Sequence, residues 1–363
     1  ANKSRPNVIL ILSDDMGYSD LPKFGKSEIP TPNIDRLARE GVLFTDAYVT
    51  APICVASRMG LLSGQYQQRF GIYDNIYGEK KVEKFLQQTL LPALFQQAGY
   101  RTALIGKSHL QNLAPIPVPA DNFPNPKSNE AFLSEFTGPE YEMELANFWA
   151  ENPDKELALP YYGFAHVDLC NGHGDRMSGH YLNWAAAKVP SFKDLIGPAN
   201  ALSYDGFDFD EAWRTAVPEE LYSTTFIEEH TVNYLEKHNP AGEPFFIQCS
   251  FPDPHHPFTP PGKYFDMYTP ADYILPRSFS DKHEHAAPHY QRAIREGASG
   301  LRRGVNMFAP TETELREMAA KEYGMISMID DGIGAILRQL QTLGLDENTI
   351  IVFTSDHGDM FGD

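Results

Sequence analysis

Short, largely apolar segments recur along the chain, and polar residues follow most of them. Four such segments occupy residues 7–13, 101–105, 245–251 and 349–355. Apolar runs of this length without alternation are typical of strands buried on both faces of a parallel sheet. Residues 161–167 are a weaker strand candidate. The pattern therefore predicts the strands of a mainly parallel sheet.

Segments with helical spacing of apolar residues lie between these strands. Thr31 is placed as the N-cap of a first helix, and Thr311 opens a capping box before a long amphipathic helix. Two further helices are predicted over residues 89–97 and 218–237. Strands that alternate with helices predict an α/β fold, in which helices cover both faces of the central sheet.

The length of 363 residues allows either one large α/β domain or two domains. We expect one domain over residues 1–363, because the strand and helix pattern runs from end to end. Segments that resist assignment or are rich in polar residues predict insertions near residues 115–215 and 277–306.

Charge and composition restrict the partners. The chain has 30 Lys and Arg residues against 49 Asp and Glu residues, a net charge of −19. Such an acidic chain is not expected to bind nucleic acid or an anionic membrane. No apolar run approaches the roughly 20 residues of a membrane-spanning helix. The chain enters a strand almost at once, so we expect that a signal peptide was removed and that the protein is periplasmic or secreted.

Polar side chains follow four of the predicted strands directly. They are Asp14 and Asp15, Lys107 and His109, His255, and Asp356 and His357. Because ligands of parallel α/β sheets bind beyond the carboxyl ends of the strands, we expect these side chains to face one site.

The carboxylates in this set indicate a metal site. Adjacent Asp14 and Asp15 repel each other unless a cation or hydrogen-bond donors lie nearby. Asp356 and His357 add a carboxylate and an imidazole, so the set favours a hard divalent cation, most simply Ca²⁺. The nitrogen ligand leaves Mg²⁺ or another metal open. A pair of aspartates alone is equally typical of a turn or a helix cap.

A cysteine-centred motif is the most specific signal. The segment CVASR begins at Cys54 and is followed closely by LSGQ. The chain also contains NVILILSDDMG, TPNIDRLAREGVLFTDAY, IGKSHL, PHHP and LGLDENTIIVFTSDHGD. Together these segments resemble the type I, formylglycine-dependent sulfatases of the alkaline phosphatase superfamily, and the carbohydrate sulfatases among them in particular.

The resemblance implies that a maturase oxidises Cys54 to formylglycine (3-oxoalanine), whose hydrate attacks the sulfate. The hydrate has a second hydroxyl that expels sulfate afterwards, which a serine lacks. Ala56 stands where the commoner family motif has proline, and alanine is associated with the anaerobic, radical-type maturase. The implied metal ligands are Asp14, Asp15, Asp356, His357 and the converted Cys54.

The resemblance also implies a role for each remaining motif residue. Arg58 would hold the formylglycine hydrate, and Lys107 would stabilise developing negative charge. His109 would accept the proton from the second hydroxyl. His255 would protonate the leaving alcohol, with His256 as its rival.

Substrate contacts are less constrained by the sequence. His166, His173 and Arg303 are candidates for binding hydroxyl or sulfate groups, although ordinary loop or surface roles explain them equally well. Aromatic residues make up 12% of the chain, which suits a sugar because aromatic faces stack on pyranose rings. The expected partners are a sulfated oligo- or polysaccharide and the maturase.

Two other functions fit the same residues. One is a phosphate mono- or diester hydrolase of the same superfamily, which uses the same sheet and metal. The other is a non-catalytic binder of sulfated glycans, if Cys54 remains a thiol. The family usually adds a second sulfate-contacting lysine and a small C-terminal domain on an antiparallel sheet, and neither occurs in this sequence.

Overall fold

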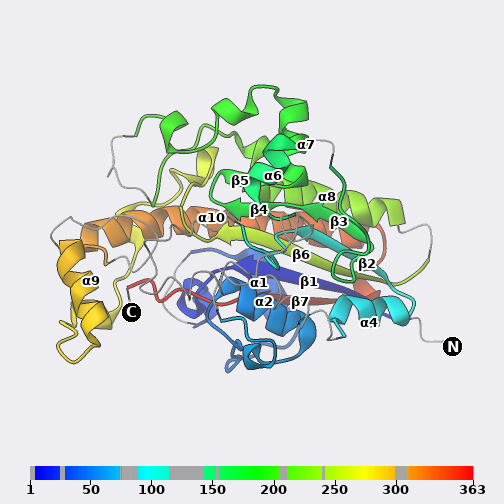
Figure 1. Cartoon of the computed structure of the whole chain (residues 1–363), viewed down its shortest axis with the longest axis horizontal. Coiled ribbons are helices and arrows are strands. Elements are labelled where there is room, and N and C mark those ends of the chain that lie inside the picture. Colours follow the sequence, from blue (N-terminus) through cyan, green and yellow to red (C-terminus); the bar gives the residue numbers. More distant parts are fainter. Residues whose placement is uncertain are drawn as a thin grey trace, which may run out of the picture.

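Among the described residues, five parallel strands form the main sheet in the order β3-β2-β6-β1-β7. A computed structural model describes residues 5–24, 29–73, 75, 85, 89–113, 143–152, 155–204, 211–238, 242–298 and 309–362. The strands are β1 (Asn7–Asp14), β2 (Arg101–Gly106), β3 (His166–Leu169), β6 (Phe245–Pro254) and β7 (Thr349–Ser355). All four segments with the strongest strand pattern lie in this sheet, which confirms the predicted fold class (Figure 1).

Helices cover both faces of the sheet. The helices of the described residues are α1 (Pro32–Glu40), α2 (Cys54–Ser63), α4 (Leu91–Gln97), α6 (Ala146–Glu151), α7 (His180–Lys188), α8 (Ser223–His238), α9 (Pro288–Ala298) and α10 (Glu312–Thr342). Figure 1 shows α8 and α10 on the opposite side of the sheet from α2 and α4, with α10 running along most of the molecule. Within the described residues, no helix is both long and apolar enough to span a bilayer.

Each face of the sheet has its own hydrophobic core. Ile247 packs in the core with residues of α8 and α10, whereas its neighbour Phe246 packs in the core with residues of α2. This division follows from the strand geometry, because successive side chains point to opposite faces. Short 3₁₀ helices lie in the connections, at Tyr18–Asp20, Pro22–Phe24, Gln67–Arg69, Phe192–Asp194, Pro198–Asn200, Glu219–Leu221, Gly262–Tyr264, Pro270–Asp272, Arg277–Ser280 and Asp346–Asn348.

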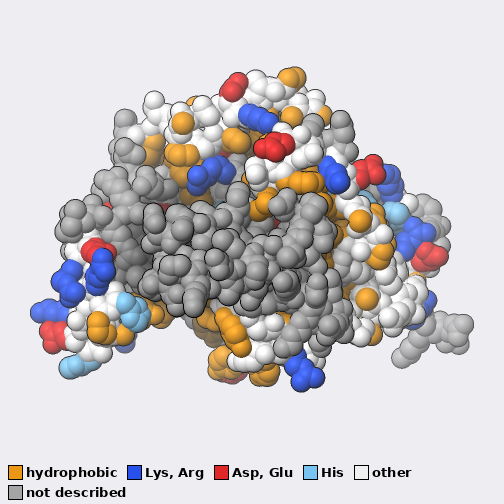
Figure 2. Space-filling view, in the orientation of Figure 1, with side chains coloured by type: hydrophobic (Ala, Val, Ile, Leu, Met, Phe, Trp, Pro, Cys, Tyr) orange, Lys and Arg blue, Asp and Glu red, His pale blue; other side chains and the backbone are white. Residues whose placement is uncertain are grey.

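The two predicted insertions differ in their relation to the sheet. The first contributes β3, an edge strand of the main sheet, and then the antiparallel hairpin of β4 (Asn171–His173) and β5 (Arg176–Ser178). The second contributes α9, which lies at one end of the molecule in Figure 1. Figure 2 shows basic and acidic side chains together at that end, as expected of a surface segment.

Two predicted boundaries moved for local reasons. The strand expected over residues 161–167 begins only at His166, because Tyr162 and Gly163 have positive φ values of 48° and 88° and turn the chain. The helix expected from residue 218 begins at Ser223, after a 3₁₀ turn at Glu219–Leu221.

The predicted N-caps also had different outcomes. Thr311 accepts a hydrogen bond from the Glu314 backbone nitrogen at 3.3 Å, which confirms the capping box. Thr31 occupies the N-cap position of α1, but its side chain makes no capping bond. The carboxylate of Asp330 from α10 caps α1 instead, accepting from the backbone nitrogens of Asn33 at 3.1 Å and Ile34 at 2.8 Å.

Candidate active site

The predicted strand-end residues meet at the carboxyl edge of the sheet. The Asp356 backbone nitrogen donates to the Ser13 carbonyl at 3.1 Å, which joins the ends of β1 and β7. The Lys107 backbone nitrogen donates to the Ser250 carbonyl at 2.8 Å, which joins the end of β2 to β6. The parallel register therefore delivers side chains from four distant segments to one buried region.

Gly106 is required for this junction. Its φ is +107°, and a Cβ atom there would lie 1.9 Å from the Ser250 carbonyl oxygen. Only glycine permits both the conformation and the close approach. Lys107 can therefore enter the site directly from the end of β2.

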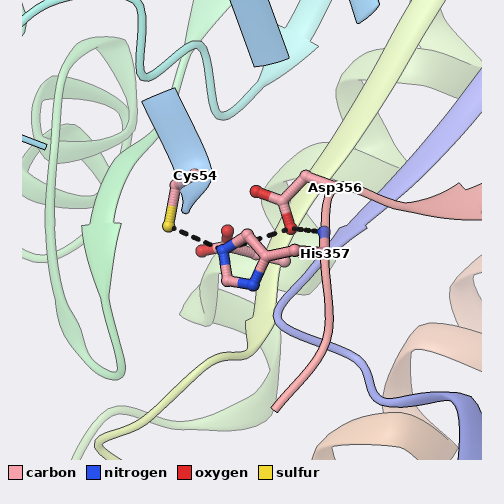
Figure 3. A group of neighbouring side chains, drawn as sticks. Cys54, Asp356 and His357 are labelled. Atoms are coloured by element: carbon pink, nitrogen blue, oxygen red, sulfur yellow. Dashed lines mark hydrogen bonds and ion pairs between the residues drawn. The ribbon is translucent and has the colours of Figure 1, made fainter. Parts of the chain in front are cut away.

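Cys54 is the first residue of α2, and its side chain points at His357 (Figure 3). Cys54 Sγ lies 3.1 Å from His357 Nε2, within hydrogen-bonding distance. Asn75 Oδ1 accepts a hydrogen bond from the Val55 backbone nitrogen at 3.2 Å. Asn75 thus provides a partner for one of the backbone donors at the start of α2. Burial raises the pKa of the Cys54 thiol, and the nearby Asp14 carboxylate adds to this rise.

Four buried residues offer a ligand set for a metal. Asp14, Cys54, Asp356 and His357 each present one ligand atom, and these atoms lie within 4.8 Å of one another. Carboxylate oxygens beside one imidazole nitrogen fit a divalent cation. Asp15, the fifth predicted ligand, contacts His357 Nδ1 at 3.0 Å and belongs to a neighbouring group with His255 and His256.

Arg58 links the two buried carboxylates of this set. Its Nε lies 2.8 Å from Asp356 Oδ2, and its Nη2 lies 3.2 Å from Asp14 Oδ1. Its Nη1 donates to the Lys107 carbonyl at 3.1 Å and to Ser250 Oγ at 2.9 Å. Burial alone would lower the pKa of Arg58, but Asp356 and Asp14 raise it above its usual value. Arg58 therefore remains charged and fixes both carboxylates.

Lys107 is fully buried beside the same carboxylates. Its ammonium group donates to Asp14 and to His173 Nε2, the latter at 2.9 Å. Burial alone would raise the pKa of Asp14, but Lys107 and Arg58 together hold it well below the usual range. Asp14 is thus an anion that two cations share.

The histidines form a layer next to this cluster. His255 Nε2 and His256 Nδ1 lie 3.8 Å and 3.9 Å from Asp15 Oδ2. His255 Nδ1 donates a hydrogen bond to the His256 carbonyl, so the other ring nitrogen of His255, Nε2, is the one that faces Asp15. Burial lowers the pKa of His255 to about 4. His109 is buried, and its ring centroid lies 6.3 Å from that of His173.

The three predicted substrate contacts have different outcomes. His166 lies at the start of β3, away from the carboxyl edge, and binds Asp168 at 2.8 Å. Arg303 lies outside the described residues. His173 does join the cluster, through Lys107.

Sequence reasoning missed two residues that the structure places in the site. Ser250 is a polar residue inside a buried strand, and this could have identified it as a candidate site residue. Asn75 lies after α2, and the sequence around it gives no comparable sign of a role in the site.

Comparison with known proteins gives the family of the chain. The family model described as Sulfatase matches residues 6–363. The chain belongs to the sulfatase family. An arylsulfatase of Clostridium perfringens (strain 13 / Type A) is 29% identical over 370 residues, covering 99% of this chain and 64% of that sulfatase. An ulvan-active sulfatase of Formosa agariphila is 26% identical, covering 99% of this chain and 52% of its own length.

A solved structure extends the likeness to a different ester hydrolase. The phosphonate monoester hydrolase of Agrobacterium radiobacter has a TM-score of 0.68 and 25% identity, covering 99% of this chain and 64% of that one. This sulfatase-family chain therefore spans less than two thirds of the length of each of these three relatives.

Proposed function

We propose that the chain carries the catalytic domain of an enzyme that hydrolyses sulfate esters of a carbohydrate. The observation that supports this most is the position of Cys54. Its Sγ lies within one ligand group with Asp14, Asp356 and His357. A reactive group formed at this side chain would act beside the metal and at the carboxyl edge of the sheet.

Two groups would supply the chemistry that ordinary side chains lack. In this family the cysteine becomes formylglycine, and its hydrate would supply the nucleophilic hydroxyl. A divalent cation held by Asp14, Asp15, Asp356 and His357 would lower the pKa of that hydroxyl and polarise a sulfate oxygen.

The side chains around Cys54 would prepare the site for this chemistry. Arg58 holds Asp14 and Asp356 in fixed orientations, so the ligand set needs little rearrangement. Lys107 places a buried positive charge where negative charge would develop on the sulfate. His255 Nδ1 donates to a carbonyl, so Nε2 is the atom that would protonate a leaving oxygen, after the ring has taken up a second proton there. His109, two residues after Lys107, stays the predicted acceptor of the second hydroxyl proton.

A carbohydrate substrate is the finer part of this proposal. It is supported by the ulvan-active relative and by the aromatic content of the chain, at 12%. Conversion of Cys54 requires a maturase as a partner. A periplasmic or secreted location remains a prediction.

Mass spectrometry and turnover together test the proposal. Replacing the SH and one H of Cys54 with an aldehyde oxygen lowers the intact mass by about 18 Da. The converted protein should hydrolyse 4-nitrophenyl sulfate and members of a panel of defined sulfated oligosaccharides. Protein made without a maturase is the control and should be inactive. Full turnover by Cys54→Ser, or a native protein without converted species, would overturn the mechanism.

The likeness to the phosphonate monoester hydrolase favours a second candidate, hydrolysis of phosphonate or phosphate esters at the same site. The same converted preparation decides between the two. A kcat/KM on a 4-nitrophenyl phosphonate monoester that exceeds the value on every sulfate ester would make the second candidate the function. Binding of sulfated glycans without turnover would indicate the non-catalytic alternative.

A further inference from the structure

The β4–β5 hairpin packs directly on the segment that carries the candidate proton donor. Gly174 lies in the hairpin turn with a φ of +59°. A Cβ atom there would lie 2.8 Å from the Pro257 carbonyl oxygen and 3.1 Å from Thr259 Oγ1. The close approach at this glycine brings the preceding residue, His173, over the ends of the main strands.

His173 is an acceptor for the buried lysine. Its Nε2 lies 2.9 Å from Lys107 Nζ. A lysine ammonium only donates hydrogen bonds, so His173 Nε2 accepts and the ring carries its proton on Nδ1. Lys107 donates a second hydrogen bond to Asp14. Because the nitrogen is tetrahedral, two fixed N–H groups also fix the direction of the third.

The ring of His173 also packs against His255. The His173 and His255 rings are stacked, with centroids 3.9 Å apart and an interplanar angle of 23°. His255 Nδ1 is bound to the His256 carbonyl. The stacking and this hydrogen bond together set the plane and the rotation of the His255 ring.

Asp175 anchors the hairpin from the other side. Its side chain is buried and accepts from the Gly197 backbone nitrogen at 3.0 Å, from Trp213 Nε1 at 3.0 Å and from Thr215 Oγ1 at 2.7 Å. Three donors from two other parts of the chain thus hold the turn that follows His173. The packed loops therefore set the position of His173, and bound substrate is not needed for it.

We propose that His173 is a positioning residue, which directs the third N–H of Lys107 toward the sulfate and holds the ring plane of His255. This inference rests on the proposed function. It gives His173 a different role from a direct substrate contact, because Lys107 already occupies its Nε2.

Two substitutions separate the two contacts of His173. His173→Phe keeps a flat ring to stack on His255 but removes the acceptor for Lys107. His173→Gln keeps an acceptor of similar reach but removes the ring. Each converted variant is measured on 4-nitrophenyl sulfate, whose leaving group needs no protonation, and on a sugar sulfate, whose leaving group does. The exposed His285→Gln serves as the matched control and should leave both activities unchanged.

The two variants should fail differently. His173→Phe should lower kcat by about 100-fold on both substrates, because charge stabilisation by Lys107 serves both. His173→Gln should stay within about fivefold on the aryl sulfate and lose about 100-fold on the sugar sulfate, as expected for impaired proton donation. A merely structural role predicts equal losses on both substrates for both variants, together with a lower Tm. That pattern, or full activity of His173→Phe, would overturn the inference.

Binding of inorganic sulfate to the unconverted protein gives a readout that does not need turnover. Calorimetry should show about tenfold weaker binding for His173→Phe than for the wild type, and near wild-type binding for His173→Gln. Equal affinities in the wild type and His173→Phe would contradict the inference even if the wild type proves an active sulfatase. A converted wild type that hydrolyses no ester, with the sulfate affinities as expected, would overturn the proposed function alone.

Discussion

Arg58 and Asp356 form a buried ion pair, with 2.8 Å between Nε and Oδ2 and side-chain exposures of 1% and 0%. The same guanidinium also reaches Asp14 at 3.2 Å. One cation therefore compensates two carboxylates that come from the ends of β1 and β7. Removing one partner of a buried pair leaves an uncompensated charge, which costs far more than the pair itself contributes.

Arg58→Met should therefore destabilise the metal-free protein strongly. We expect the free energy of unfolding, measured by chemical denaturation in EDTA, to fall by about 3–5 kcal/mol. Excess Ca²⁺ should recover part of this loss by neutralising Asp14 and Asp356. The control is Arg36→Met, since Arg36 forms an exposed pair with Glu40 on α1 and should change stability by less than about 0.5 kcal/mol. Equal losses in both variants would contradict the expectation.

Ligand linkage tests the metal site separately. A cation that binds only the folded protein adds about 2.7 kcal/mol to its stability at a concentration of 100 Kd. Ca²⁺ or Mg²⁺ should therefore raise the Tm of the wild type in a dose-dependent way. Asp356→Asn should abolish that rise, whereas the exposed Asp346→Asn should retain it. The ligand assignment fails if both variants respond to the cation as the wild type does.

The sheet and its functional edge could be predicted because both follow from local patterns. The apolar runs of β1, β2 and β6 are buried as expected, whereas β7 is an edge strand and is partly exposed. The parallel order of these strands places Asp14, Lys107 and Asp356 at one edge. The structure brought these residues together within hydrogen-bonding range of Arg58 or of one another. Each strand and the polar residue after it could be predicted from its own segment of sequence, and the parallel order then predicts the cluster.

Other features depend on contacts between distant segments and could not be predicted. Asn75 acts on the start of α2 only because the chain folds back beside Cys54. His166 was proposed as a substrate contact from its residue type, but its place at the start of β3 directs it to Asp168. The cap of α1 comes from Asp330, which lies 297 residues from Asn33.

The cap of α1 yields a prediction that runs against the sequence pattern. Asp330→Ala removes the acceptor for the Asn33 and Ile34 backbone nitrogens. We expect it to lower the free energy of unfolding by about 2 kcal/mol, since buried backbone donors lose their partner. Thr31→Ala should cost less than about 0.5 kcal/mol, because the Thr31 side chain makes no capping bond. Chemical denaturation of both variants measures the contrast, and a larger loss for Thr31→Ala would refute it.

Asp168 supplies a prediction about pH. It lies on β3, and its Oδ2 is 2.8 Å from His166 Nε2 and 3.0 Å from His230 Nδ1. Burial alone would raise the pKa of Asp168, but hydrogen bonds and charge from His166 and His230 lower it well below its usual value. The group lies apart from the candidate metal ligands, so its effect on stability can be measured without metal.

The sign of the effect follows from proton binding. Below the ordinary carboxyl pKa of about 3.9, the unfolded chain takes up a proton at Asp168 that the folded protein does not, so acid favours unfolding. The stabilisation by Asp168 is thus complete at about pH 5 and is lost as the pH falls through the lowered pKa. The difference in free energy of unfolding between the wild type and Asp168→Asn should therefore shrink from about pH 5 toward pH 3. The exposed Asp194→Asn should show no such trend in the same denaturation series, and a difference for Asp168→Asn that grows with acidification would refute the assignment.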